Sequence, residues 1–381
     1  MMIVLIKALQ LIFSLSLLIV LHEGGHYGFS KLFGVKVEKF YMFFDYKFRI
    51  FSTRMKWFTR LFPHFKDNET DYGIGWIPLG GYVKIAGMVD ESMDTEQMKQ
   101  PVQPNEFRAK SIPQRFFIMA GGVMMNLITA FVIYSVIMFS WGEDYLPIDN
   151  IKDGFEYNVY AHEIGFCDGD LPVAVDGEPI REWQSSVLRD ISTASSVTVR
   201  REGKEVVILM PDDMNLIEML QQTPPFMRIA LPEGQPRVLP ESWIAHRDYT
   251  AITCIPAGLR YGWATLKGYV SDLRYVFSRQ GAQSVGSFIT IGSIFPSTWD
   301  WFHFWNITAF LSIILAVMNI LPIPGLDGGH IALLIYEGIT GHEPSDTVML
   351  WIERIGLGFI IALMCLAFGN DIVRFIFPLF S

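Results

Sequence analysis

The chain has 381 residues, of which 51% are hydrophobic and only 18% are charged, and its mean hydropathy is +0.30. A soluble protein of this length carries about a quarter charged residues, so the composition excludes an ordinary soluble domain and indicates a polytopic membrane protein. The net charge of -9 argues against nucleic acid as a partner, and the three scattered cysteines (Cys167, Cys254, Cys365) predict neither a disulfide framework nor a thiolate metal site.

Four segments are apolar enough to cross a bilayer, which takes about 20 mainly apolar residues. They are Ile3–Tyr27, Phe116–Phe139, Phe304–Ile323 and Trp351–Phe368. The first lacks a small-residue cleavage site before His22, so we expect an uncleaved transmembrane helix rather than a secretory signal. The sequence thus predicts a polytopic α-helical membrane protein with about four transmembrane helices, in the domain ranges 1–30, 116–140, 301–329 and 350–381, the last including the tail.

The first span ends in a His-Glu-Gly-Gly-His motif. His22 and His26 are four residues apart, so on a helix they share one face, about 6 Å apart along the axis, and both imidazoles can bind one Zn²⁺. Glu23 between them can then act as the general base on the water that the metal activates. Ionisable residues inside a membrane are costly and usually serve function, which favours this interpretation over a chance match.

The loop after this motif is basic. Residues Tyr27–Lys66 hold nine Lys/Arg against two acidic residues. By the positive-inside rule the loop is cytoplasmic, which places both termini and the region Ser140–Trp301 outside. In a Gram-negative cell this predicts a multi-pass protein of the inner (cytoplasmic) membrane whose outer region lies in the periplasm.

Two stretches of the cytoplasmic region, residues 31–115, have strand patterns. Val35–Tyr41 alternates in polarity, and Gly73–Ile85 combines glycines with β-formers, so we expect membrane-associated β-hairpins. These hairpins could form a small sheet that only packs against the helices. Alternatively, they could offer a free edge that pairs with an extended substrate, with Gly80 and Gly81 as the candidate substrate-binding residues.

The outer region predicts a compact β-rich module at residues 150–211. Its expected elements are the strands Leu171–Val175, Val197–Arg201 and Glu205–Met210, the turn Asp176–Glu178 and the helix Trp183–Ile191. Residues 212–300 follow as a Pro-rich linker and an amphipathic helix on the bundle or the membrane surface. The apolar residues of this helix recur every three or four positions: Leu259, Trp263, Leu266, Val270, Leu273 and Phe277.

A third zinc ligand is expected near the end of the third span. Two prolines and three glycines surround Asp327 and should interrupt the helix at the membrane face that carries the two histidines. Asp327 is therefore the candidate ligand, and His330 is a weaker competitor. Asn319, about two turns before Asp327, could donate hydrogen bonds to a substrate carbonyl or could make only an interhelical amide contact.

These residues together predict a zinc hydrolase whose centre lies below the membrane surface and keeps one metal position open for water. A metal-binding membrane transporter or channel could use the same ligands, but it predicts further polar residues inside the other spans, where they are sparse. A non-catalytic scaffold that binds through the β-rich module is a third alternative, and the presence of Glu23 argues against it.

The combination of motifs resembles the site-2 protease family and, more narrowly, the RIP metalloproteases of the RseP type. Further stretches fit this resemblance: Ile77–Lys84 is similar to the membrane-associated β-loop of the family, Phe107–Asn126 to the start of its second span, and Val285–Ile291 and Gly369–Ile372 to its C-terminal half. Most of the chain is covered.

The resemblance implies a zinc cofactor with His22, His26 and Asp327 as ligands, a catalytic Glu23 and a substrate-facing Asn319. It implies that the module at 150–211 is a PDZ domain that filters substrates already cleaved by another protease. The implied activity is regulated intramembrane proteolysis within the lipid bilayer. Its substrates would be the transmembrane helices of single-span membrane proteins, such as an anti-sigma factor or remnant signal peptides.

The sequence departs from the family pattern in two places. Many relatives carry two PDZ domains, whereas the region after Asp212 is too short and Pro-rich to predict a second one. Phe40–Phe44 stand where relatives often have glycines, and a basic insertion follows up to Lys66. The hairpin geometry of this chain therefore cannot be taken over from the family.

Overall fold

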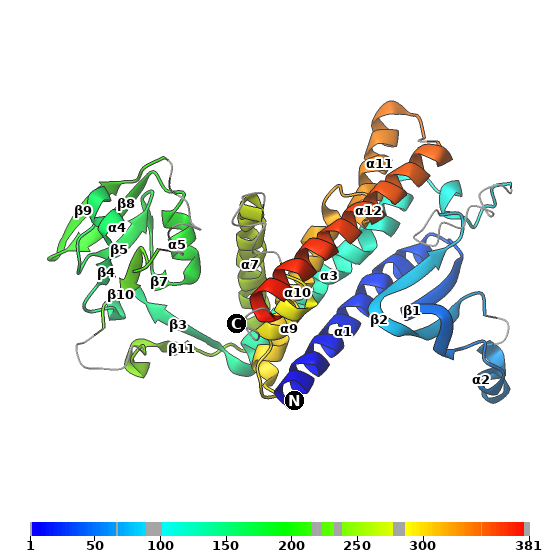
Figure 1. Cartoon of the computed structure of the whole chain (residues 1–381), viewed down its shortest axis with the longest axis horizontal. Coiled ribbons are helices and arrows are strands. Elements are labelled where there is room, and N and C mark those ends of the chain that lie inside the picture. The colour runs from blue at the N-terminus through cyan, green and yellow to red at the C-terminus, as the bar shows by residue number, and fades with distance from the viewer. Residues whose placement is uncertain are drawn as a thin grey trace. The chain divides into compact units, whose positions relative to one another are not determined.

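The computed structural model describes residues 2–65, 68–88, 101–212, 214, 219, 222–231, 238–276, 286–343 and 345–376. Lys66, Phe277, Val285 and the tail beyond residue 376, which the sequence interpretation mentions, lie outside these described residues. The chain divides into two compact units, which Figure 1 shows by residue colour. Unit 1 combines Met1–Ile137 with Ile255–Ser381, and unit 2 is Met138–Cys254.

Unit 1 contains four helices that are long and apolar enough to cross a membrane, among the residues described. They are α1 (Met2–Leu32), α3 (Ile112–Trp141), α10 (Trp301–Ile320) and α12 (Asp346–Asp371), the last continued by a π-helix over Ile372–Ile376. The expected class of a multi-helix membrane protein is confirmed. In the most apolar stretch of α3, 50% of the residues are buried, whereas in that of α12 only 6% are buried. Helix α3 therefore lies at the centre of the unit and α12 at its edge.

Two shorter helices, α7 (Cys254–Val276) and α9 (Phe288–Ile294), pack against the long helices of unit 1. In α7, the predicted amphipathic helix, Leu266 and Leu273 pack against the apolar core formed by α3 and α10. Trp263 on the same helix is 63% exposed, so the predicted apolar stripe is divided between the bundle and the outer surface. The N-terminus of α9 is held by the buried Asp371 of α12, whose carboxylate accepts hydrogen bonds from Ser287 and Thr290.

The predicted β region is confirmed as a bent antiparallel pair, β1 (Val37–Ser52) and β2 (Asp71–Ile85). The first half of β1 pairs with two segments of β2, so that Tyr41 faces Tyr82 on one side and Gly73 on the other. Phe43 and Lys47 have positive φ angles where β1 bends, and the insertion forms α2 (Lys56–Leu61) and a turn of 3-10 helix at Pro63–Phe65. Within the described pairing, the segment 77–85 of β2 pairs on one side only, which makes it an edge.

Unit 2 is a β-rich fold. A four-stranded antiparallel sheet has the order β6-β5-β8-β9, and two smaller sheets have the orders β11-β3-β7 and β10-β4. The elements are β3 (Glu143–Pro147), β4 (Phe155–Tyr157), α4 (Val159–Ile164), β5 (Leu171–Val175), β6 (Glu178–Pro179), β7 (Glu182–Trp183), α5 (Ser185–Ile191), β8 (Ser196–Arg201), β9 (Lys204–Leu209), β10 (Met227–Ile229) and β11 (Ala245–Arg247).

Several strands and one helix of this unit form where the sequence predicts them. The predicted strands are β5, β8 and β9, and the predicted helix is α5. Asp176 and Gly177, with φ angles of 47° and 82°, make the tight turn between β5 and β6. Two strands, β10 and β11, come from the region expected to be linker, because they pair with β4 and β3 from the start of the unit.

Candidate active site

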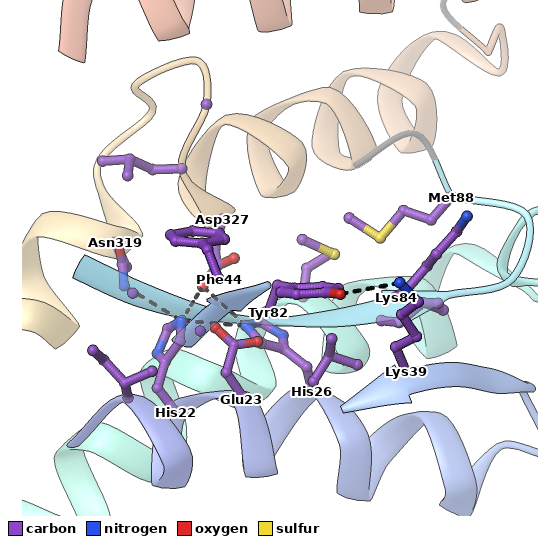
Figure 2. A pocket seen from close by; sticks show the side chains of 18 of the residues that line it. His22, Glu23, His26, Lys39, Phe44, Tyr82, Lys84, Met88, Asn319 and Asp327 are labelled. Carbon is purple, nitrogen blue, oxygen red and sulfur yellow. Dashed lines mark hydrogen bonds and ion pairs between the residues drawn. The ribbon is translucent and has the colours of Figure 1, made fainter. Parts of the chain in front are cut away.

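One uninterrupted helix positions the three polar residues of the first motif. α1 runs through His22, Glu23 and His26 without a break, so the two imidazoles project from the same face, one turn apart. Their ring centroids are 4.9 Å apart, with the planes at 85°. His26 is buried and His22 is partly buried, and Figure 2 shows Glu23 between them, directed at the same space.

A break in the second half of the chain delivers Asp327 to this space. α10 ends at Ile320, and α11 (Asp327–Thr340) begins at the aspartate itself. The turn between the helices is tight, because a Cβ at Gly328 would lie 2.0 Å from the Leu321 carbonyl oxygen. The interruption predicted from prolines and glycines is therefore present, and it places a carboxylate above the two histidines (Figure 2).

The three candidate ligand atoms form a nearly regular triangle. Asp327 Oδ2 lies 3.3 Å from His22 Nε2 and 3.3 Å from His26 Nε2, and the two Nε2 atoms are 3.3 Å apart. Donor atoms bound to a tetrahedral Zn²⁺ at 2.0 to 2.1 Å are about 3.3 Å from one another. Apart from these imidazoles, Oδ2 is buried with no hydrogen-bond partner among the described residues. The donor set and its spacing fit a zinc ion.

Glu23 lies between the metal-ligand triangle and the edge of the sheet. It lines the same pocket as Gly81 and Val83 of β2. A Cβ at Gly81 would lie 3.7 Å from Glu23 Cγ, so the backbone of Gly81 lies beside the Glu23 side chain. A Cβ at Gly81 would lie 2.7 Å from Ile19 of α1, so glycine allows the strand to approach the helix this closely.

The other candidate residues lie in the same pocket, with different surroundings. Gly80 lies against the ring of Phe44, where a Cβ would come within 2.6 Å of it. Asn319, on the last turn of α10, has its amide nitrogen 3.5 Å from His22 Nε2. His330 lines the pocket, but it is not part of the group of side chains, found among the described residues, that could hold a metal ion. That group is His22, His26 and Asp327.

The pocket has a volume of about 630 Å³, and one of its walls was not expected from the sequence. Lys39 and Asp45 of β1 form an ion pair, with the charged atoms 3.7 Å apart, and the Tyr82 hydroxyl donates to Asp45 at 2.9 Å. Burial and the neighbouring Asp45 raise the pKa of Tyr82, so the hydroxyl stays protonated and continues to donate. Sequence spacing could not reveal this group, because it depends on how β1 folds back along β2.

Comparisons with known proteins agree with this geometry. Residues 10–363 match peptidase family M50. The chain is 29% identical over 379 residues to a Rickettsia conorii protein whose name assigns it as a zinc metalloprotease, covering 95% of this chain and 97% of that one. It is 27% identical over 369 residues to a Clostridium acetobutylicum protein named in the same way, covering 95% and 96%. It is 26% identical over 411 residues to the metalloprotease MmpA of Caulobacter vibrioides, covering 97% and 96%.

Proposed function

Because the chain belongs to peptidase family M50, the site-2 protease family, and is a membrane zinc metalloprotease, we propose that it cleaves peptide bonds inside the transmembrane helices of single-span membrane proteins. One observation carries this proposal. Two of the three proposed ligands, together with Glu23, belong to α1, a helix long and apolar enough to span the membrane, and Asp327 of α11 completes the triangle. A water-activating centre at this depth can reach a peptide bond that lies within the bilayer.

The proposed zinc ligands are His22 Nε2, His26 Nε2 and Asp327 Oδ2. Zinc held by three protein ligands keeps a position for water, lowers the pKa of that water toward about 7 and polarises a carbonyl. Glu23 is the proposed general base: it removes a proton from the attacking water and delivers it to the leaving amine. Glu23 lies between His22 and His26 in the same pocket, which supports this assignment.

Asn319 and Gly81 are the proposed substrate-binding residues. The Asn319 amide is close to the ligand triangle and can donate to the carbonyl oxygen of the scissile bond. The edge segment of β2 can pair with an extended substrate, with the backbone of Gly81 available next to Glu23. Gly80 lines the same pocket and makes room for Phe44 beside that edge. A substrate helix therefore has to unwind locally before it is cut.

Unit 2 is the proposed PDZ-like filter of this enzyme. Its four-stranded sheet and the helix α5 form from the module that the sequence singles out, and this supports the proposal. The basic loop after α1 supports a cytoplasmic position for the β1–β2 region, and hence an outer position for unit 2 and both termini. Substrates already shortened outside an inner membrane by another protease, such as an anti-sigma factor or a remnant signal peptide, would pass such a filter.

The substitution Glu23→Gln tests the activity. It removes the proton acceptor but keeps the size of the side chain, so cleavage of a single-span substrate in liposomes should fall by about 10²- to 10⁴-fold. The zinc content of the purified variant should equal that of the wild type. The protease assignment of Glu23 is wrong if the variant cleaves at the wild-type rate. A soluble peptide of the same sequence, offered without lipid, tests whether the substrate has to be embedded in the membrane.

A further inference from the structure

The central helix α3 contributes no proposed zinc ligand, yet it contacts both ligand imidazoles. His26 Nδ1 lies 2.8 Å from the backbone carbonyl oxygen of Ile118. His22 Nδ1 lies 3.1 Å from the side-chain amide of Asn126, two turns further along α3. We propose that Asn126 is a positioning residue, which holds neutral His22 in the tautomer whose Nε2 binds zinc. This inference rests on the proposed zinc site.

The chemistry of the two ring nitrogens decides what each partner must be. A histidine that binds zinc through Nε2 carries its proton on Nδ1, and this N–H needs an acceptor. The Ile118 carbonyl can only accept, so it fixes His26 in this form. Asn126 can do the same for His22 only if its amide oxygen, and not its nitrogen, faces Nδ1.

The zinc-binding tautomer of His22 requires the Asn126 oxygen in that place, because its Nδ1–H donates and an amide nitrogen cannot accept. With Nδ2 facing His22 Nδ1, Oδ1 is buried and has no hydrogen-bond partner among the residues that the structure describes. A half-turn of the amide exchanges two atoms of nearly equal size. It gives the buried oxygen a donor, the His22 Nδ1–H at the same 3.1 Å. Ser312 of α10 donates to the backbone carbonyl of Asn126, at 2.7 Å, so the side-chain amide remains available to His22.

Close packing of the two helices fixes this arrangement. A Cβ at Gly122 of α3 would lie 2.4 Å from His22 Cε1 and 2.5 Å from His26 Nε2. The backbone of α3 therefore lies directly against both rings, and one turn later Asn126 follows on the same face. Asn126 is fully buried, so water cannot replace its amide as the partner of His22.

Two substitutions at this position separate positioning from simple packing. Asn126→Leu keeps the branched shape and the number of side-chain heavy atoms but removes the acceptor, and should weaken zinc binding by about 10- to 100-fold. Asn126→Asp supplies a carboxylate oxygen to the His22 Nδ1–H, and should bind zinc at least as tightly as the wild type. If Asn126 served only to pack the helices, the order would reverse, because a buried carboxylate in an apolar interface is worse than leucine.

The measurement is zinc affinity of the full-length protein in detergent, by competition with a chelator, together with the visible spectrum of the Co²⁺-substituted forms. Ser312→Ala is the matched control: it deletes a buried hydrogen bond of the same interface without touching either ring, and should leave the affinity unchanged. Wild-type affinity in Asn126→Leu, or weaker binding by Asn126→Asp than by Asn126→Leu, overturns the inference. Absence of zinc binding by the wild type would instead overturn the proposed site.

Discussion

Next to the candidate metal site, α1 and α3 contact each other through glycines. The core of unit 2, in contrast, is filled by large apolar side chains. Gly25 and Gly121 lie so close that a Cβ on Gly25 would be 2.1 Å from the Gly121 carbonyl oxygen. In unit 2, Phe155, Phe166 and Phe226 are at most 1% exposed and form the centre of the apolar cluster.

This difference follows from the forces that stabilise each kind of packing. Helices in a lipid bilayer gain little from burying apolar side chains against one another, so small residues that allow close backbone contact hold them together. A β-rich fold such as unit 2 is stabilised by the apolar side-chain area that its own core buries. The α1–α3 contact therefore leaves no room for an added Cβ at Gly25, whereas the core of unit 2 loses stability when a buried atom is removed.

The largest expected effect comes from adding one methyl group to the helix contact. Gly25→Ala should push α1 and α3 apart by more than 1 Å, and activity should fall by about 100-fold or more, with loss of bound zinc. The neighbouring Gly24 has no atom within 4 Å of its would-be Cβ, so Gly24→Ala is the matched control and should keep nearly wild-type activity. The measurement is the cleavage rate and the zinc content of both variants, each compared with the wild type. Equal behaviour of the two would show that the close contact does not matter.

A smaller effect is expected from removing atoms in unit 2. Val199 in β8 is fully buried, and Val199→Ala should destabilise this unit by about 2 kcal/mol through lost burial and a small cavity. Val207 on the adjacent β9 is 62% exposed, so Val207→Ala should change stability little. Hydrogen exchange of residues 138–254 measures both. Loss of zinc in Val199→Ala would contradict the separation of the two regions.

The smallest effect concerns a histidine in a setting unlike that of the metal centre. The exposed His246 donates to Asp144 at 2.6 Å and to Asp248 at 3.2 Å, and these carboxylates raise its pKa above the usual 6.5. The folded state thus favours the protonated ring. Its stabilising contribution is fully present below about pH 6.5 and is lost as the pH rises through the raised value.

Hydrogen exchange of the β3–β11 pair across this pH range tests the effect. Protection, corrected for the intrinsic exchange rate, should decline with rising pH in the wild type and stay flat in His246→Gln. The β5–β8 pair in the same unit serves as an internal reference. A decline of equal size in the variant would mean that another group titrates.

Local patterns were sufficient for much of this chain. Hydropathy located the four spans, and the alternation and turn residues of Leu171–Leu209 located β5, β8, β9 and the hairpin turn. The strands β10 and β11 could not be predicted from the sequence, because three-residue strands have too little pattern and form only by pairing with distant partners. The Lys39–Asp45–Tyr82 group could not be predicted either, because no local sequence pattern indicates the bend in β1 or its pairing with two segments of β2.

For the site itself, the sequence alone determined which residues could meet. The four-residue spacing puts His22 and His26 on one helix face, and the prolines and glycines around Asp327 interrupt a helix. Only the tertiary structure decided that the three candidate ligand atoms lie 3.3 Å apart and that Asn126 contacts His22. The physical reason is range: spacing fixes neighbours within a helix turn, whereas contacts across a hundred or more residues depend on how closely whole helices and strands can approach.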